Sequence, residues 1–245
     1  MKNRILLFAT CTSLFLAACT ELQQIGETIL TTPTGTESVL SNEDVIAGLK
    51  QALEIGAEQA ASLSSKVDGF NKNDLIRIPF PEDAIKVKET AEQYGLGGQV
   101  EKFETTLNRA AEEAAKQAAP IFVNAIKEMT VADGFAILNG GDNAATTYLK
   151  DKTTAQLKLQ FEPKVATAIE TEELTKFWEP LISKYNTVTM FTGGEQINPD
   201  LQDYVTNRAI DGLFVHVAQE EKKIRDNPQA RVTDLLQKVF GSIGQ

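Results

Sequence analysis

The chain has a single histidine, His216, within a stretch that predicts a long helix. Glu220 follows it by four residues, so both side chains would share one face of that helix. A His–Glu pair at this spacing can bind a metal ion when a further ligand comes from another helix. The alternative is a core histidine, because His216 continues an apolar stripe through Val205 and Ala209. The core interpretation is favoured, so we assign no catalytic residue, metal ligand or cofactor.

A second polar stretch, "LNGGDNAATTYLKDKT", covers residues 138–153. Gly140 and Gly141 would let backbone amides approach a ligand, and Asp142 could bind a cation or activate water. The favoured interpretation is structural. Glycine commonly follows a helix because it adopts a left-handed conformation cheaply, and Asp142 would cap the next helix. Thr153 would then cap the helix after that.

Several further charged residues are candidates for a pocket or a buried polar network. Arg208 and Asp211 lie three residues apart on the same predicted helix and would form an ion pair. Arg77 and Arg109 could likewise serve a buried polar network. The full set of candidates is Arg77, Arg109, Asp142, Arg208, Asp211, His216 and Glu220.

Both cysteines, Cys11 and Cys19, lie at the start of the chain. Lys2 and Arg4 precede an apolar run that is too short to span a bilayer, which takes about 20 residues. Residues 1–18 are therefore predicted to be a secretory signal peptide. Its end, Leu16-Ala17-Ala18-Cys19, resembles the lipobox of bacterial lipoproteins. That resemblance implies a lipid on Cys19, after which the mature chain has no free thiol for catalysis, disulfides or metal binding.

Residues 19–40 are predicted to be the lipidated cysteine and a flexible tether, because they are rich in Thr and Gly and lack a sustained apolar period. Residues 41–245 would then form a single domain in the periplasm. Thr20 differs from the Asp that resembles an inner-membrane retention signal, which favours the inner leaflet of the outer membrane. The lipid is the expected membrane contact, because the net charge of −10 opposes binding to nucleic acids and anionic surfaces.

The elements that would position these residues are mostly helices. The predicted order is a helix from Ser41 to Ser65, an extended segment around Pro79 and Pro81, and then helices separated by glycines, caps and prolines. The longest runs from 199 to 228 and is apolar on most sides, which is typical of a central helix. A last helix would run from Thr233 through Phe240.

Three short segments are ambiguous: "LIRIPF", "AQLKLQFEP" and "TVTMF" alternate in polarity or contain β-branched residues. They could form a small sheet, giving an α+β fold. The favoured interpretation makes 154–170 a helix with a kink near Pro163 and the other two segments extended connectors. The predicted fold class is thus all-α, a multi-helix bundle of roughly eight to ten helices around a central long helix.

Four segments, "IRIPFPE", "ILNGGDNAATTYLKDKT", "DYVTNRAIDGLF" and "EEKKIRDNPQARVTDLLQKVFG", resemble the domain of unknown function 4197 family of bacterial envelope proteins. They span roughly residues 41–240 in the order of that family. The resemblance implies a helical domain, often behind a lipoprotein signal. It supplies no catalytic residues.

Two classes of function follow from this reading. The favoured one is a non-enzymatic envelope lipoprotein that binds a protein, lipid or peptidoglycan partner. The alternative is a carboxylate- or metal-dependent hydrolase or transferase of the envelope. A cleft lined by Asp211, His216 and Glu220 would favour the enzyme, and an exposed apolar groove would favour the binding module.

Overall fold

The computed structural model describes residues 41–171, 174–198 and 200–227. All of these belong to a unit that begins at Leu40. The predicted signal peptide, the lipidated Cys19 with its tether, and the helix expected near 233–240 lie outside the described residues.

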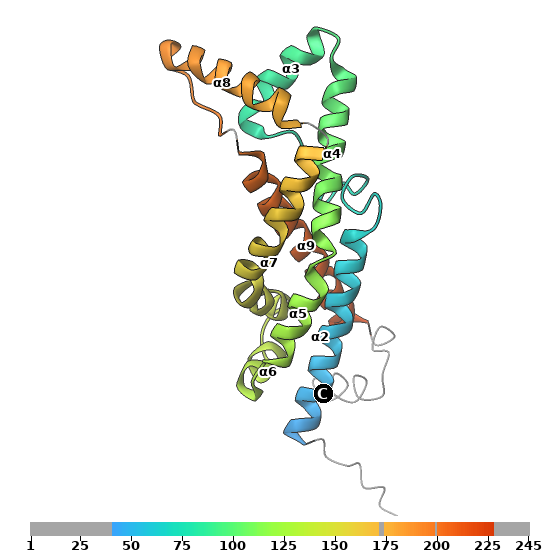
Figure 1. The fold of residues 1–245 in the computed structure, drawn as a ribbon. Helices are drawn as coiled ribbons and strands as arrows, with labels where there is room; N and C mark the ends of the chain where they lie inside the picture. Colours follow the sequence, from blue (N-terminus) through green and yellow to red (C-terminus); the bar gives the residue numbers. More distant parts are fainter. Residues whose placement is uncertain (1–40, 172–173, 199, 228–245) are drawn as a thin grey trace, which may run out of the picture. The chain divides into compact units, whose positions relative to one another are not determined.

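The described part of the chain is mostly helical and contains no strand, which confirms the all-α prediction. None of its helices is long and apolar enough to cross a membrane. The elements, shown in Figure 1, are α2 (Asn42–Ser65), the 3-10 turn η1 (Glu82–Ala84), α3 (Ile85–Gln93), α4 (Gly97–Ala115), α5 (Ala118–Lys127), α6 (Val131–Leu138), α7 (Ala144–Thr171), α8 (Leu174–Thr192) and α9 (Leu201–Asp226).

Local caps set the starts of three helices. Ser41 accepts a hydrogen bond from the Asp44 amide at 3.1 Å, and Asp44 accepts one from the Ser41 amide in return. Thr130 starts α6 with the same reciprocal pair, as its sequence predicts. Asp200 caps α9 by accepting a hydrogen bond from the Asp203 amide at 3.0 Å.

Helix α9 is the central helix and packs against α2, α4 and α7 (Figure 1). Small residues at the contacts let the helices approach closely, because an alanine side chain occupies little space between two helix backbones. Ala60 on α2, Ala111 and Ala114 on α4 and Ala209 on α9 are all fully buried. Larger side chains fill the remaining volume, and the fully buried ones include Phe70, Phe122, Phe161, Leu107, Leu157 and Leu213.

The structure corrects two sequence predictions about helix boundaries. Thr153 caps no helix, since α7 continues through it and its hydroxyl donates to the Leu149 carbonyl at 2.6 Å. "TVTMF", residues 187–191, is the last part of α8 and not an extended connector. Threonine hydroxyls there satisfy helix carbonyls: Thr187 donates to Ser183 O at 2.8 Å and Thr189 to Asn186 O at 3.1 Å.

Residues 66–81, between α2 and η1, are not helical: turns occupy most of the first part, and the extended stretch predicted around Pro79 and Pro81 follows them. We call residues 66–81 the linking segment. Phe70, Ile76, Ile78 and Phe80 are buried in this segment, and its turns are closed by backbone hydrogen bonds such as Arg77 N–H to the Asn73 carbonyl at 2.8 Å. Its remaining backbone groups need partners on the helices, and buried polar side chains of α4 supply several of them.

Candidate functional site

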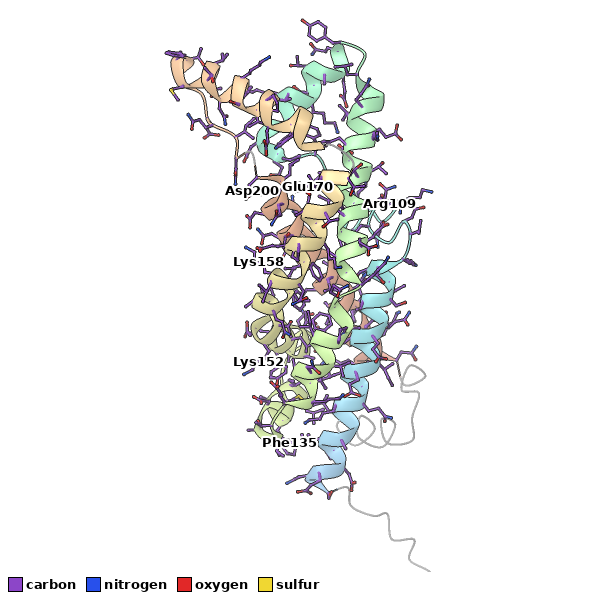
Figure 2. The ribbon with its side chains drawn as sticks, in the orientation of Figure 1. Arg109, Phe135, Lys152, Lys158, Glu170 and Asp200 are labelled. Atoms are coloured by element: carbon purple, nitrogen blue, oxygen red, sulfur yellow. The ribbon has the colours of Figure 1, made fainter. Side chains whose placement is uncertain are left out.

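The first half of the linking segment is held by α4. The Glu112 carboxylate accepts hydrogen bonds from the backbone amides of Phe70 and Asn71 at 3.1 and 3.2 Å. Arg109 bridges Glu112 and Asp68, donating at 2.5 and 2.6 Å, and Figure 2 shows it projecting from α4 toward this segment. The hydrogen bond to Glu112 raises the pKa of Arg109, so the Arg109 side chain stays protonated.

Asp68 occupies a strained backbone conformation at the start of the same segment, with φ of 65°. Hydrogen bonds from Lys72, 2.9 Å away, and from Arg109 lower the pKa of Asp68 to about 2. The next residue, Gly69, is required by space, because an added Cβ would lie 2.5 Å from the Leu63 carbonyl oxygen. These contacts fix the conformation of the chain where it leaves the C-terminal end of α2.

The second half of the linking segment is held by Asn108 and Glu104, one and two helical turns away from Glu112 on α4. The Asn108 amide side chain accepts from the Ile78 N–H and donates to the Ile78 carbonyl, both at 2.8 Å, as a neighbouring strand would. Glu104 accepts from Arg77 at 2.6 Å and from Lys88 at 2.7 Å. Burial raises the pKa of Glu104, but these two cations outweigh burial and lower the pKa overall.

His216 joins the linking segment to α2. It is only 5% exposed. Ser64 uses its hydroxyl proton on the Ala60 carbonyl at 2.9 Å, so His216 Nδ1 must donate to Ser64 Oγ, also at 2.9 Å. His216 Nε2 then accepts from the Asn73 amide at 3.1 Å. Both ring nitrogens are occupied in a neutral imidazole, and burial lowers its pKa.

Glu220, the metal partner considered for His216, instead accepts a hydrogen bond from Lys223 at 2.7 Å. Among the residues that the structure describes, no group of three or more His, Cys, Asp or Glu is placed to hold a metal ion. The i,i+4 spacing of His216 and Glu220 therefore serves two separate structural contacts on α9.

Asp142 does not cap α7, contrary to the sequence prediction. It is exposed, and α7 begins two residues later at Ala144. The cap comes from α9: the Glu221 carboxylate accepts hydrogen bonds from the amides of Ala145 and Thr146 at 3.0 and 2.8 Å. A carboxylate at a helix N-terminus is also favoured by the helix dipole.

Arg225 completes this junction between α6 and α7. Its guanidinium donates to Glu221 at 2.8 Å and to the Ile137 carbonyl near the end of α6 at 3.0 Å. The two glycines between these helices do not have positive φ, which corrects the second part of the prediction. Gly140 is needed for space, because a Cβ there would lie 2.5 Å from Ala144 Cβ, whereas Gly141 faces open space.

Arg208 and Asp211 are not paired with each other. Arg208 donates to Glu82 at 3.1 Å, and Asp211 faces Lys150 at 3.6 Å. Asp211 is also exposed, although burial was expected. Both residues line a cleft of about 320 Å³, whereas His216 lines a different cleft of about 390 Å³ beside Asp68 and Asn73, and Glu220 is part of the lining of neither.

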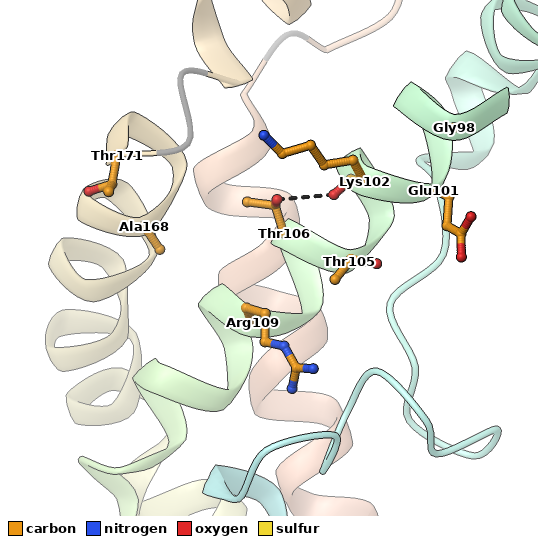
Figure 3. Close-up of a pocket in the computed structure, with 8 residues that line it drawn as sticks. All are labelled: Gly98, Glu101, Lys102, Thr105, Thr106, Arg109, Ala168 and Thr171. Atoms are coloured by element: carbon orange, nitrogen blue, oxygen red, sulfur yellow. Dashed lines mark hydrogen bonds between the residues drawn. The ribbon is translucent and has the colours of Figure 1, made fainter. Parts of the chain in front are cut away.

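A further cleft of about 590 Å³ lies between α4 and α7 (Figure 3). Thr105, Thr106 and Arg109 line it from α4, and Ala168 and Thr171 line it from α7. Arg109 is committed to Glu112 and Asp68, and Thr106 donates to the Lys102 carbonyl at 3.0 Å. Thr171 likewise donates to the Thr167 carbonyl at 2.7 Å, so these three polar side chains already have partners within the protein.

The largest cleft, about 750 Å³, lies between α7, α8 and the start of α9. Its lining combines apolar and polar groups, with Ile169, Trp178, Met190 and Leu201 beside Ser183 and Asn186. Trp178 is itself buried and packs on Phe80 and Phe103, with ring centroids 5.7 and 5.2 Å away. This cleft combines apolar surface with polar side chains, as binding sites do.

One protein-family model matches residues 39–241, nearly the whole chain, and its description is "Protein of unknown function (DUF4197)". The chain belongs to this family. No curated protein and no solved structure matches it. The family assignment confirms the resemblance seen in the sequence and adds no site residue.

Sequence reasoning missed the buried carboxylates Glu104, Glu112 and Glu221, and selected exposed Asp142 and Asp211 instead. A signal for the first two was present. Glu104, Asn108 and Glu112 recur every four residues, which places three polar side chains in one row on α4 beside the buried Leu107 and Ala111. For Glu221, the i,i+4 spacing with Arg225 was the available signal.

Proposed function

We propose that the protein is a lipid-anchored envelope protein that faces the periplasm and whose helical domain is a non-enzymatic binding module. The observation that carries the anchor is the order of charge, apolar run, Leu16-Ala17-Ala18 and Cys19 at the start of the chain. Thr20 supports the inner leaflet of the outer membrane. Several acyl chains on one cysteine would make the attachment effectively permanent.

The polar groups of the interior support a binding module. His216, Glu104, Glu112 and Glu221 each have structural partners that hold the linking segment or a helix end. A cleft lined jointly by Asp211, His216 and Glu220 would have favoured the enzyme alternative, whereas Asp211 and His216 line two different clefts. The cleft between α7 and α8 remains as the favoured binding surface for an envelope protein, a lipid or peptidoglycan.

The anchor is tested with Cys19→Ala in cells grown with a labelled fatty acid. We expect label on the wild-type protein and none on the variant, which should accumulate as an uncleaved precursor. Equal labelling of the two proteins would refute the lipid anchor.

The binding surface is tested with a photo-crosslinking amino acid in intact cells, followed by mass spectrometry. Ser183, which lines the cleft between α7 and α8, is the test position, and exposed Gln59 on α2 is the control. We expect a defined adduct from position 183 alone. Adducts only from position 59, or none from 183, would argue against this cleft.

A further inference from the structure

The end of α8 presents three apolar side chains to solvent. Val188, Met190 and Phe191 are 60%, 67% and 84% exposed. Gly193, with φ of 72°, turns the chain directly after the helix. We call Val188, Met190 and Phe191 the α8 apex; Figure 1 shows this end of α8 leading away from the helices against which α9 packs.

The α8 apex is held firmly from its other side. Ile182 and Thr189 are buried, and the Asn186 side chain donates to the Ile197 carbonyl and accepts from the Ile197 amide, both at 2.8 Å. The helix is thus held on the face that carries Ile182, Asn186 and Thr189, whereas Val188 and Phe191 stay in water and Met190, which also lines the cleft between α7 and α8, is largely exposed. Exposed apolar groups on an anchored helix indicate an interaction surface.

The charge around the apex distinguishes it from the rest of the molecule. Residues 180–194 form the longest run without Asp or Glu after residue 20, in a chain with 34 acids and a net charge of −10. Lys184 is the one charged residue of this run. Within this run an anionic lipid headgroup would meet one cation and no carboxylate, whereas the net charge of the chain is repulsive.

We propose that the α8 apex inserts its apolar side chains into the surface of a lipid bilayer. The proposal rests on the proposed lipid anchor, because the tether between Cys19 and Ser41 would span at most about 70 Å when extended. Three apolar side chains would bind a bilayer too weakly to recruit a free protein. A protein that is already tethered to the bilayer makes the same contact intramolecularly, so weak binding is enough. We favour a bilayer over another protein as the partner. Insertion into a bilayer needs only apolar side chains, whereas a protein partner would also be expected to match charged groups.

The test uses the full mature, lipidated protein with Phe191→Cys. A thioether blocks the sulfur of lipidated Cys19, and the chain has no other cysteine after the signal, so a thiol-reactive environment-sensitive dye labels position 191 alone. The matched control is Gln59→Cys on the exposed face of α2. Each protein is reconstituted into phosphatidylethanolamine–phosphatidylglycerol vesicles with and without lipids that carry a quencher in their acyl chains.

We expect several-fold stronger quenching at position 191 than at position 59, and loss of that difference when Val188→Ser and Met190→Ser are added. Equal quenching at both positions in protein that floats with the vesicles would overturn the membrane contact and leave the anchor intact. Labelling of two thiols would show unmodified Cys19, overturning the anchor and with it the tethered contact. A blue shift that grows with protein concentration before vesicles are added would identify a second copy as the occupant and refute the proposal.

Discussion

His216 illustrates how one side chain connects three parts of the chain. Its Nδ1 reaches Ser64 on α2 and its Nε2 reaches Asn73 in the linking segment. Replacing His216 with Leu would remove the donor to Ser64 Oγ and the acceptor for the Asn73 amide, and losing a hydrogen-bond partner costs a buried group about 1–3 kcal/mol. His216→Gln keeps a donor and an acceptor, so we expect it to be clearly milder in urea unfolding. Equal losses for the two variants would contradict this account.

The same residue predicts a pH dependence. Burial and the nearby Lys66 lower the pKa of His216, and Glu220 and Lys223 are the other charges that act on it. The folded state therefore prefers the neutral ring. The stability from this preference is complete above the unfolded pKa of about 6.5 and is lost as the pH falls below it. We expect the melting temperature to fall more between pH 7.5 and 5.5 in the wild type than in His216→Gln. Parallel curves would show that His216 does not titrate with unfolding.

At the level of elements, the start of α7 depends on a carboxylate from α9. Glu221→Ala removes the acceptor for the Ala145 and Thr146 amides and leaves Arg225 without its closest acceptor. We expect a loss of about 1–3 kcal/mol in the free energy of unfolding. Asp142→Ala, although nearer in sequence, should change it by less than about 0.5 kcal/mol, because Asp142 is exposed. A reversed order would restore the original assignment of Asp142 as the cap.

The contact between α9 and the linking segment depends on Gly212. A Cβ at this position would lie 2.6 Å from Phe70 Cε1 and 3.0 Å from Ile76 Cβ, so Gly212→Ala should push the segment off the helix. We expect a loss of about 1–3 kcal/mol. The control is Gly98→Ala, where nothing lies within 4 Å and alanine improves helix propensity. Stabilisation by both substitutions would show that the segment adjusts freely.

At the level of the whole molecule, the helical unit begins with a cap that needs no residue before it. Ser41 and Asp44 satisfy each other across the first turn of α2. We therefore expect a chain that starts at Ser41 to have the same unfolding midpoint in urea as the chain from Cys19 with Cys19→Ala. A lower midpoint for the shorter chain would mean that residues before Ser41 stabilise the fold.

The sequence by itself determined the features that depend on neighbouring residues. The all-α fold, the central helix and the caps at Ser41, Thr130 and the start of α9 follow from side chains within one helical turn of their partners. The motif at Cys19, on which the proposed lipid anchor rests, is likewise local. Family membership followed from several such segments appearing in order.

Only the tertiary structure decided which distant groups meet. Glu221 and Thr146 are 75 residues apart, and His216 and Ser64 are 152 apart. A buried polar group takes whichever partner the packing of helices brings within about 3 Å, so spacing along the chain does not reveal it. The helix over "TVTMF" was decided in the same way, because Asn186 and the buried Ile182 and Thr189 fix α8 against local β propensity.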